Sequence, residues 1–341
     1  MMRFLLLAVC ASSLIAAPCT TGSRECTERV ALGVEGRWTL VYRSFPLTIP
    51  NEKIIRALIV VHGQGRNADN YFASAMAAAF LAGAMEDTLV ISPKLASNDS
   101  RGCRDELEPG EVNYRCSGDS WRSGAAAVDE ARISSYDVTD QVLKLLARKD
   151  VFPNLKSIVM TGHSAGGQYV TRYAAASRVH DTLGVKVEYF VANPSSYAYF
   201  DATRLPASAS CNEKGECTAD FTPYGDARNC TTYDNWPYGL KGRSGGYTAN
   251  LKDEDLKKQY AERPVTYLLG ELDTLPLAGF DSSCPAMAQG ASRLQRGLTY
   301  SSYVNKKFGA HHKVLIVPLC GHNARCIYTA DVTLPLLFPR P

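Results

Sequence analysis

Short apolar segments alternate with helical segments along most of this chain, and this alternation constrains its fold more than any other feature. Residues 54–61 (IIRALIVV) form an almost continuous apolar run, which is typical of a strand buried on both faces of a parallel sheet. Further strands are predicted at 38–45, 88–92, 157–161, 185–192, 265–269 and 313–317, and helices at 68–85, 128–151 and 165–177. The sequence therefore predicts an α/β fold, with a mostly parallel sheet and helices on both of its faces.

Two long stretches, residues 96–127 and 195–263, lack this alternation. Loops of such length are rarely structureless inside a domain. We therefore expect residues 195–263 to be an ordered, disulfide-rich insertion that caps one end of the sheet. Its aromatic side chains are equally consistent with an aromatic-lined cleft and with a core of the insertion itself: Tyr197, Tyr199, Tyr233, Trp236, Tyr238 and Tyr247.

The N-terminus has the features of a secretory signal peptide. Arg3 precedes an apolar run at 4–9, and small residues at 15–17 resemble a cleavage site. The apolar run is too short to cross a bilayer as a helix, and no later stretch approaches the necessary length. We predict a signal peptide over residues 1–17, a single domain over 18–341 and a secreted, extracellular protein.

Cysteine usage agrees with export. Of the 11 cysteines, Cys10 lies in the predicted signal peptide, and the even number that remains indicates a disulfide framework. A zinc site is less favoured because no C-x-x-C spacing occurs. Sequence order predicts the short-range pairs Cys19–Cys26, Cys103–Cys116, Cys211–Cys217, Cys230–Cys284 and Cys320–Cys326. In a eukaryotic host, the acceptor triplets at Asn98 and Asn229 would also predict a glycoprotein.

One pentapeptide carries a candidate nucleophile. Residues 162–166 (GHSAG) match the pattern G-x-S-x-G, and Ser164 lies directly between the strand at 157–161 and the following helix. A strand–turn–helix of this kind places the serine on a sharp, exposed turn. The pattern recurs at 242–246 around Ser244, but no strand precedes that match. We therefore assign the nucleophile to Ser164.

A serine nucleophile needs a base to take its proton and an acid to orient the base. On such a turn the chain order is Ser, then Asp or Glu, then His, each following a strand. Asp273 follows the strand at 265–269 and His322 follows the strand at 313–317, so they are the predicted acid and base. Glu271 and Asp281 are weaker candidates for the acid. We interpret the remaining downstream histidines, His180, His311 and His312, as surface or exposed loop residues.

Acyl transfer also requires hydrogen-bond donors for the developing oxyanion. The backbone N–H of Ala165, at the start of the helix after Ser164, is one predicted donor. The other is expected from the loop HGQGRN at 62–67, which follows the buried strand at 54–61. Gln64 is the first candidate in that loop and Gly65 the second.

These residues resemble a known family. His62-Gly63, followed by Asn67-Ala68 and Tyr71-Phe72, together with GHSAGG at 162–167, resembles secreted α/β-hydrolases, in particular polyhydroxybutyrate depolymerases and feruloyl esterases. The resemblance covers most of residues 58–323 at the level of element order and does not extend to the insertion at 195–263. It implies the α/β-hydrolase fold and the reaction type, but it does not identify the substrate.

Together these features predict a secreted serine hydrolase that cleaves a small-molecule or polymeric ester through an acyl-enzyme, with no metal or organic cofactor. Lys and Arg total 37 and Asp and Glu total 34, so no broad charge indicates nucleic acid as a partner. No membrane anchor is predicted. The alternatives are a peptidase, amidase, lipase or thioesterase on the same triad, and a non-catalytic binding protein of this fold.

Overall fold

A computed structural model describes residues 17–340 except residues 101, 119, 244 and 278. Almost all of the predicted signal peptide therefore lies outside the described residues, and so does Ser244. No helix in the described ranges is both long and apolar enough to cross a membrane.

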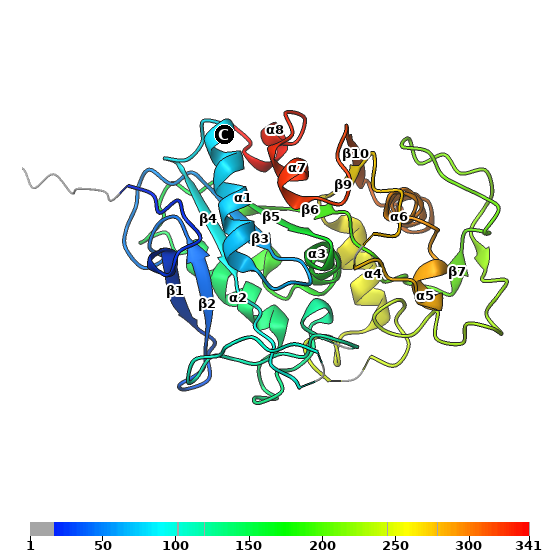
Figure 1. The fold of residues 1–341 in the computed structure, drawn as a ribbon, viewed down its shortest axis with the longest axis horizontal. Helices are drawn as coiled ribbons and strands as arrows, with labels where there is room; N and C mark the ends of the chain where they lie inside the picture. The colour runs from blue at the N-terminus through cyan, green and yellow to red at the C-terminus, as the bar shows by residue number, and fades with distance from the viewer. Residues whose placement is uncertain (1–16, 101, 119, 244, 278, 341) are drawn as a thin grey trace, which may run out of the picture.

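The centre of the protein is an eight-stranded sheet with the strand order β1-β2-β4-β3-β5-β6-β9-β10 (Figure 1). Its strands are β1 (Thr27–Ala31), β2 (Trp38–Arg43), β3 (Arg56–Val61), β4 (Thr88–Pro93), β5 (Ser157–His163), β6 (Lys186–Ala192), β9 (Val265–Gly270) and β10 (Lys313–Val317). β2 pairs antiparallel with β1 and with β4, and the strands from β4 to β10 pair in parallel. The predicted mostly parallel sheet is confirmed.

Helices cover both faces of this sheet (Figure 1). One face packs against α1 (Ala68–Leu81), α7 (Ala324–Thr329) and α8 (Leu334–Leu337), and the other against α2 (Ser135–Leu146), α3 (Ala165–Ala176), α4 (Asp253–Glu262) and α6 (Arg293–Phe308). Leu58 and Val60 of β3 belong to the first core, and Ile59 and Val61 belong to the second. Both sets of side chains are buried because successive residues of a strand point to opposite faces, which explains the continuous apolar run.

The remaining elements are short. They are the α-helix α5 (Cys284–Met287), the two-stranded pair β7 (Thr203–Arg204) and β8 (Thr222–Pro223), which lies in the insertion, and the 3-10 helices η1 (Arg24–Cys26), η2 (Trp121–Ser123) and η3 (His180–Thr182).

The helix predicted at 128–151 is shorter than expected and begins only at Ser135. A capping box sets this start: Ser134 Oγ accepts from the backbone N–H of Asp137, and Asp137 Oδ2 accepts from the backbone N–H of Ser134. Several elements were not predicted from the sequence, among them β1, α4, α6 and α7. β1 is an edge strand with only one buried residue, Val30, and α6 buries polar side chains, including Arg293 and Arg296, which hide its helical pattern.

All five predicted disulfides are present: Cys19–Cys26, Cys103–Cys116, Cys211–Cys217, Cys230–Cys284 and Cys320–Cys326. Cys230–Cys284 joins the insertion to α5.

Most aromatic side chains of the insertion form a core. The ring centroid of Tyr197 lies 4.3 Å from that of Tyr300, and that of Tyr199 lies 4.4 Å from that of Tyr303, both partners being on α6. The side chains of Tyr233 and Tyr247 are also buried. Of the two readings left open by the sequence, the core is therefore the right one for these four tyrosines.

Candidate active site

Ser164 lies on the turn between β5 and α3, in a strained backbone conformation with φ 59° and ψ −119°. Glycines two residues before and two residues after Ser164 leave the space that this turn needs. A Cβ added to Gly166 would lie 2.2 Å from the Val61 carbonyl oxygen, and one added to Gly162 would lie 2.4 Å from the Gly166 carbonyl oxygen. The strand, the loop after β3 and the helix thus approach closely beneath the serine, as the pentapeptide predicts.

A chain of two hydrogen bonds connects Ser164 to Asp273. His322 Nε2 lies 3.0 Å from Ser164 Oγ, and His322 Nδ1 lies 2.7 Å from Asp273 Oδ2. An ionised carboxylate only accepts, so Nδ1–H donates to Asp273 and the Nε2 lone pair faces the serine hydroxyl. The structure therefore brings together the three residues that the sequence singled out, from three different strand ends, in the geometry of a nucleophile, a base and an orienting acid.

Asp273 is buried and is held by a residue that the sequence did not reveal. Its Oδ1 lies 3.4 Å from Arg293 Nη1, and both side chains are fully buried. Arg293 Nε donates in turn to Ser195 Oγ at 2.7 Å. Burial lowers the pKa of Arg293, and the adjacent carboxylate opposes this shift. The guanidinium compensates the charge of Asp273 and limits the directions in which the carboxylate can point.

Asn193 joins the loops of the acid and the base. It follows β6 with a positive φ of 44°, and its Oδ1 accepts from the backbone N–H of Gly270 at 2.8 Å. Its Nδ2 donates to the carbonyl oxygen of Gly321, the residue before His322. A polar residue directly after a buried strand was the only sequence signal for this role.

His163 lies against the predicted base, with its ring centroid 4.5 Å from that of His322. Burial lowers the pKa of His163 well below the usual range, and the neighbouring His322 and Arg293 add to this effect. His163 therefore stays neutral beside the ring of His322.

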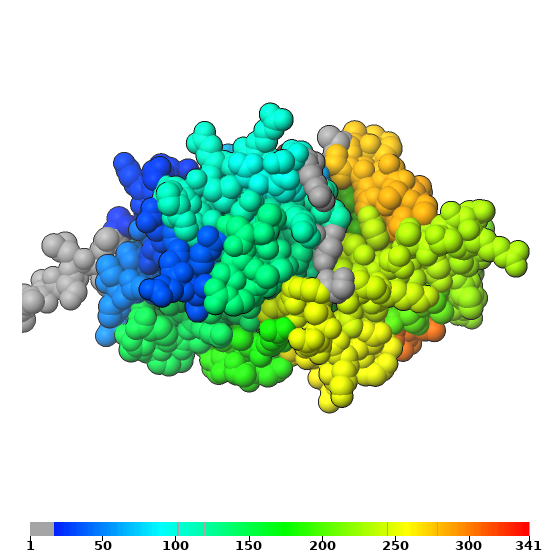
Figure 2. Space-filling view, turned by 90° about the horizontal axis from the view of Figure 1, so that it is seen from below, coloured from blue at the N-terminus to red at the C-terminus, as the bar shows by residue number. Residues whose placement is uncertain are grey.

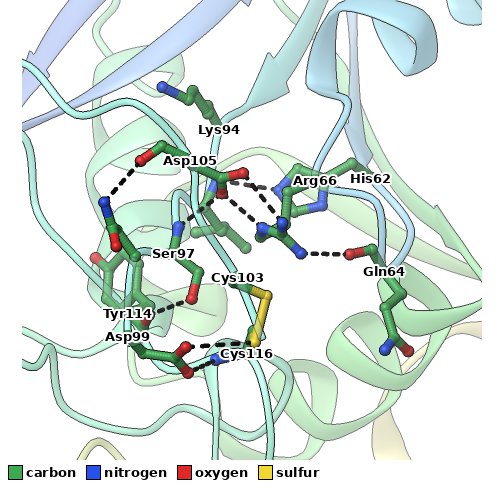
Figure 3. Close-up of polar contacts among 12 residues, drawn as sticks. His62, Gln64, Arg66, Lys94, Ser97, Asp99, Cys103, Asp105, Tyr114 and Cys116 are labelled. Atoms are coloured by element: carbon green, nitrogen blue, oxygen red, sulfur yellow. Dashed lines mark hydrogen bonds and ion pairs between the residues drawn. A yellow bond between two sulfur atoms is a disulfide. The ribbon is translucent and has the colours of Figure 1, made fainter. Parts of the chain in front are cut away.

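The loop after β3, residues 62–67, is tied to the segment after β4 by two contacts (Figure 3). His62 Nε2 accepts from the backbone N–H of Leu95 at 3.0 Å, while its Nδ1 lies 2.9 Å from the Gly63 carbonyl oxygen. The Arg66 guanidinium donates to both carboxylate oxygens of Asp105, through Nε at 2.5 Å and Nη2 at 3.0 Å.

Arg66 also fixes the peptide next to Gln64. Its Nη1 donates to the Gln64 carbonyl oxygen at 2.7 Å, and its backbone N–H closes a turn onto the Gly63 carbonyl oxygen at 3.1 Å. Asp105, for its part, accepts from the backbone N–H of Ser97, and it lies two residues beyond Cys103 of the Cys103–Cys116 disulfide (Figure 3). The disulfide-linked segment therefore holds the loop that carries the predicted oxyanion donor.

Comparison with solved structures decides the fold. A poly(3-hydroxybutyrate) depolymerase from Bordetella parapertussis superposes with a TM-score of 0.60 at 18% sequence identity, over 92% of this chain and 89% of that chain. Poly(aspartic acid) hydrolase-1 from Sphingomonas sp. KT-1 superposes with a TM-score of 0.57 at 20% identity, over 92% of this chain and 97% of that chain. This chain has the α/β-hydrolase fold. No protein-family model and no curated protein sequence matches it.

Within this fold, the other candidate acids have different partners. Glu271 Oε2 accepts from the backbone N–H of Leu319 at 2.9 Å. The Asp281 carboxylate accepts from Tyr238 Oη and from the backbone and side chain of Ser283. Neither carboxylate shares a hydrogen bond with His322, which leaves Asp273 as the acid that contacts it.

Two of the other histidines are less exposed than predicted. His312 is buried, with Nε2–H donating to the Tyr260 carbonyl oxygen at 2.9 Å and Nδ1 lying 3.0 Å from Tyr267 Oη. His180 is half-buried, 2.9 Å from Tyr189 Oη. His311 is exposed, as expected. The prediction for His312 is wrong because α4 and β9 cover the turn that precedes β10.

Two cavities open beside Ser164, and Gln64 lines both of them. The larger, of about 390 Å³, is also lined by His322, Tyr71 and Arg325, and we call it the base-side cavity. The other, of about 270 Å³, is lined by residues that include Ala165, Arg122, Gln168, Tyr238 and Asp281, and we call it the helix-side cavity. The insertion thus borders the site through Tyr238.

Proposed function

We propose that this protein is a serine hydrolase that cleaves carboxylic esters through a covalent intermediate on Ser164. The observation that carries the proposal is the hydrogen-bonded chain from Ser164 Oγ through His322 to the buried Asp273, with the serine held on a strained turn. A serine hydroxyl in such a chain is activated for attack on a carbonyl carbon. The fold also hosts many esterases, but sharing it does not assign an activity.

The residues suggest the following sequence of steps. Ser164 Oγ attacks the ester carbonyl carbon as its proton passes to His322 Nε2, and the carbonyl electron pair moves onto oxygen. The backbone N–H groups of Ala165 and Gln64 stabilise this oxyanion. Collapse of the tetrahedral intermediate breaks the bond to the alcohol oxygen, which takes the proton from His322. Water then attacks the acyl carbon as His322 takes its proton. Collapse of this second tetrahedral intermediate breaks the bond between the acyl carbon and Ser164 Oγ, which takes the proton from His322 as the acid is released.

We propose export for the same protein because five disulfides form in its described part. Bonds of this kind persist in oxidising compartments and are rare in the cytosol. Expression of the full chain in a secreting host, followed by N-terminal sequencing of the product in the medium, tests both the export and the predicted cleavage after about residue 17.

A fluorophosphonate probe tests the enzymatic proposal directly. The wild-type protein should be labelled on Ser164, as located by peptide mapping, and labelling should be lost in Ser164→Ala and strongly reduced in His322→Ala. Hydrolysis of p-nitrophenyl butyrate should follow the same order. A folded wild-type protein that neither reacts with the probe nor hydrolyses the ester would instead be the non-catalytic binding protein that the sequence left open.

Amide hydrolysis is the second candidate, because one structural neighbour is named as a hydrolase of poly(aspartic acid), a polymer with an amide backbone. A matched pair of substrates, with the same acyl group attached to an alcohol or to an amine, separates the two activities. We expect the ester to be cleaved faster.

A further inference from the structure

The helix-side cavity leads from Ser164 to two arginine side chains. Arg122, from η2 in the irregular segment 96–127, lines this cavity. It also lines an adjoining cavity of about 90 Å³, whose wall includes Arg172 of α3. The two cavities share Arg122, Gln168, Tyr238 and Asp281. Figure 2 shows the face of the molecule on which the segments that contribute Arg122 (green-cyan), Tyr238 (yellow-green) and Asp281 (orange) come together.

Neither guanidinium group forms an ion pair with any residue that the structure describes. Arg122 is partly buried, and it donates from Nε to Ser120 Oγ and from Nη2 to the Cys116 carbonyl oxygen. Arg172 is only 2% exposed, and it donates from Nε to the Pro237 carbonyl oxygen and from Nη2 to Ser196 Oγ. The Nη1 group of each side chain has no hydrogen-bond partner among the described residues.

This arrangement differs from that of three other buried arginines. Arg56, Arg263 and Arg293 each contact a carboxylate, namely Asp87, Asp181 and Asp273. The buried Arg296 also forms no ion pair among the described residues, but it donates to the carbonyl oxygens of Gly290, Ser195 and Asp281. A charged group removed from water is costly unless an opposite charge compensates it. An unpaired guanidinium at the wall of a cavity is therefore well suited to bind an anion that enters from outside, since its N–H groups match a carboxylate in a bidentate arrangement.

Among the described residues, Asp281 supplies the single carboxylate that lines these cavities, and it does not cancel the two positive charges. Asp281 is already bound by Tyr238 Oη at 2.8 Å and by the backbone and side chain of Ser283. Burial lowers the pKa of Arg122, and nearby Tyr238 and Asp281 only oppose this shift. Burial lowers the pKa of Arg172 as well, and Arg122 adds to that shift by repulsion. The described residues that line the two cavities therefore carry a net positive charge.

The position of His322 shows which part of a substrate occupies this cavity. In the proposed mechanism His322 gives its proton to the alcohol oxygen, so the leaving alcohol lies on the side of His322, in the base-side cavity. The helix-side cavity, lined by Ala165 and not by His322, is left for the acyl group. Arg122 then lies where the far end of the acyl chain would point.

We propose that this hydrolase selects esters whose acyl group ends in a carboxylate, which binds Arg122 with Arg172 behind it. The preferred substrates are thus monoesters of dicarboxylic acids, or chains of such units with a free acid end. This inference rests on the proposed ester hydrolysis at Ser164 and adds the substrate class to it.

The test compares substrates that differ only in the terminal group. Values of kcat/KM are measured for monoethyl succinate, glutarate, adipate and suberate, and for ethyl butyrate, valerate, hexanoate and octanoate. We expect the wild-type protein to favour the acidic member of at least one pair by about tenfold or more, the range of a charge-assisted hydrogen bond. Added salt should weaken this preference.

Three variants locate the effect. Arg122→Gln should reduce the preference for the acidic ester to near unity, mainly by raising KM for that ester, and Arg122→Lys should retain part of it. Arg325→Gln is the matched control, because it removes one positive charge from the base-side cavity beside the same serine. It should leave the preference for the acidic acyl group unchanged. Melting temperatures verify that each variant is folded.

The outcomes separate this inference from the proposed function. If the wild-type protein hydrolyses neutral esters as fast as or faster than every acidic partner, the inference is wrong while the esterase proposal stands. The inference is also wrong if Arg122→Gln and Arg325→Gln reduce the preference equally. The preference would then come from the overall positive potential near Ser164 and not from binding to Arg122. Failure to hydrolyse any of these esters or to react with the fluorophosphonate probe would overturn the esterase proposal itself.

Discussion

Arg66 and Asp105 form a bidentate ion pair that joins the loop after β3 to the disulfide-linked segment after β4. Both side chains are largely buried, at 12% and 20% exposure. Because Arg66 also donates to the Gln64 carbonyl oxygen, the ion pair orients the peptide group that follows Gln64. It also restrains the short loop that contains the backbone N–H of Gln64. The strength of an oxyanion donor depends on such preorganisation.

Asp105→Ala should therefore reduce kcat much more than it reduces stability. A donor displaced by about 1 Å loses on the order of a hundredfold in rate, so we expect a fall of about ten- to a hundredfold, with KM less affected. Asp150→Ala is the control, because it removes the exposed Arg148–Asp150 pair, and such pairs contribute little. If folded Asp105→Ala retains full turnover, the ion pair does not position the loop.

Ser164→Ala should abolish ester hydrolysis and leave the fold unchanged, because only the nucleophilic oxygen is removed from the turn. Ser244→Ala, at the second match to the same pentapeptide pattern, should keep wild-type activity. Turnover is measured with p-nitrophenyl butyrate and the fold by circular dichroism. Activity within tenfold of wild type in Ser164→Ala would exclude this serine as the nucleophile.

Asp273→Asn should lower kcat by about a thousandfold to ten-thousandfold, because an amide does not hold the imidazole in the required tautomer or stabilise its positive charge. Glu271→Gln, two residues away, provides the comparison, since the Glu271 carboxylate accepts from the backbone N–H of Leu319 and forms no hydrogen bond with His322 among the described residues. It should change kcat less than about threefold. Equal losses in the two variants would contradict the assignment of Asp273 as the acid.

The residues of the candidate triad were predictable because each follows a short apolar strand. Apolar runs locate the strands, parallel pairing brings their carboxyl ends to one edge, and Ser164, Asp273 and His322 are the reactive residues found there. Their supporting contacts were not predictable. Arg293 lies in a helix whose buried face is polar, and Asp105 lies in a segment without periodicity. Tertiary packing determines the partners of such side chains, and it leaves no local pattern in the sequence.

The same reason explains the error at His312, and this residue has a consequence for stability. Burial lowers the pKa of His312 to about 4 from an ordinary value of 6.5. Between these values the unfolded chain binds a proton that the folded protein excludes, so the free energy of unfolding decreases as the pH falls from about 6.5 towards 4. The loss is about 1.4 kcal/mol per pH unit for one such group. His62, whose pKa burial also lowers to about 4, adds to it.

Urea unfolding of wild type and His312→Gln at several pH values between neutrality and about pH 4.5 tests this linkage. The variant should be less stable at neutral pH, since it loses the hydrogen bonds of His312 with Tyr260 and Tyr267. The slope of its unfolding free energy against pH should be smaller than that of wild type by the equivalent of about one proton. Parallel curves for the two proteins would show that His312 is not excluded from protonation in the folded state.

The Cys320–Cys326 disulfide closes the loop that contains His322. Cys320 is buried, and its carbonyl oxygen accepts from the backbone N–H of Leu272 in the loop of Asp273. Cys326 lies in α7, whose first turn is capped by the Asn323 side chain. The bond thus fixes His322 between the loop of its acid and a helix. With a sequence separation of 6, it constrains the unfolded chain by only about 2 kcal/mol in the entropy model.

The double variant Cys320→Ala/Cys326→Ala should therefore lose more in turnover than in stability. The insertion offers a matched control in Cys211–Cys217, which has the same sequence separation of 6 and, at the level of loop entropy, the same expected effect on the unfolded chain. We expect the two double variants to have similar losses in melting temperature. Only the first should lose about ten- to a hundredfold in kcat, because only its loop carries the predicted base. Full turnover in a folded Cys320→Ala/Cys326→Ala variant would mean that the Asp273 and Asn193 contacts are sufficient to position His322. An equal loss of kcat in both double variants would mean that the Cys320–Cys326 disulfide has only a general structural role.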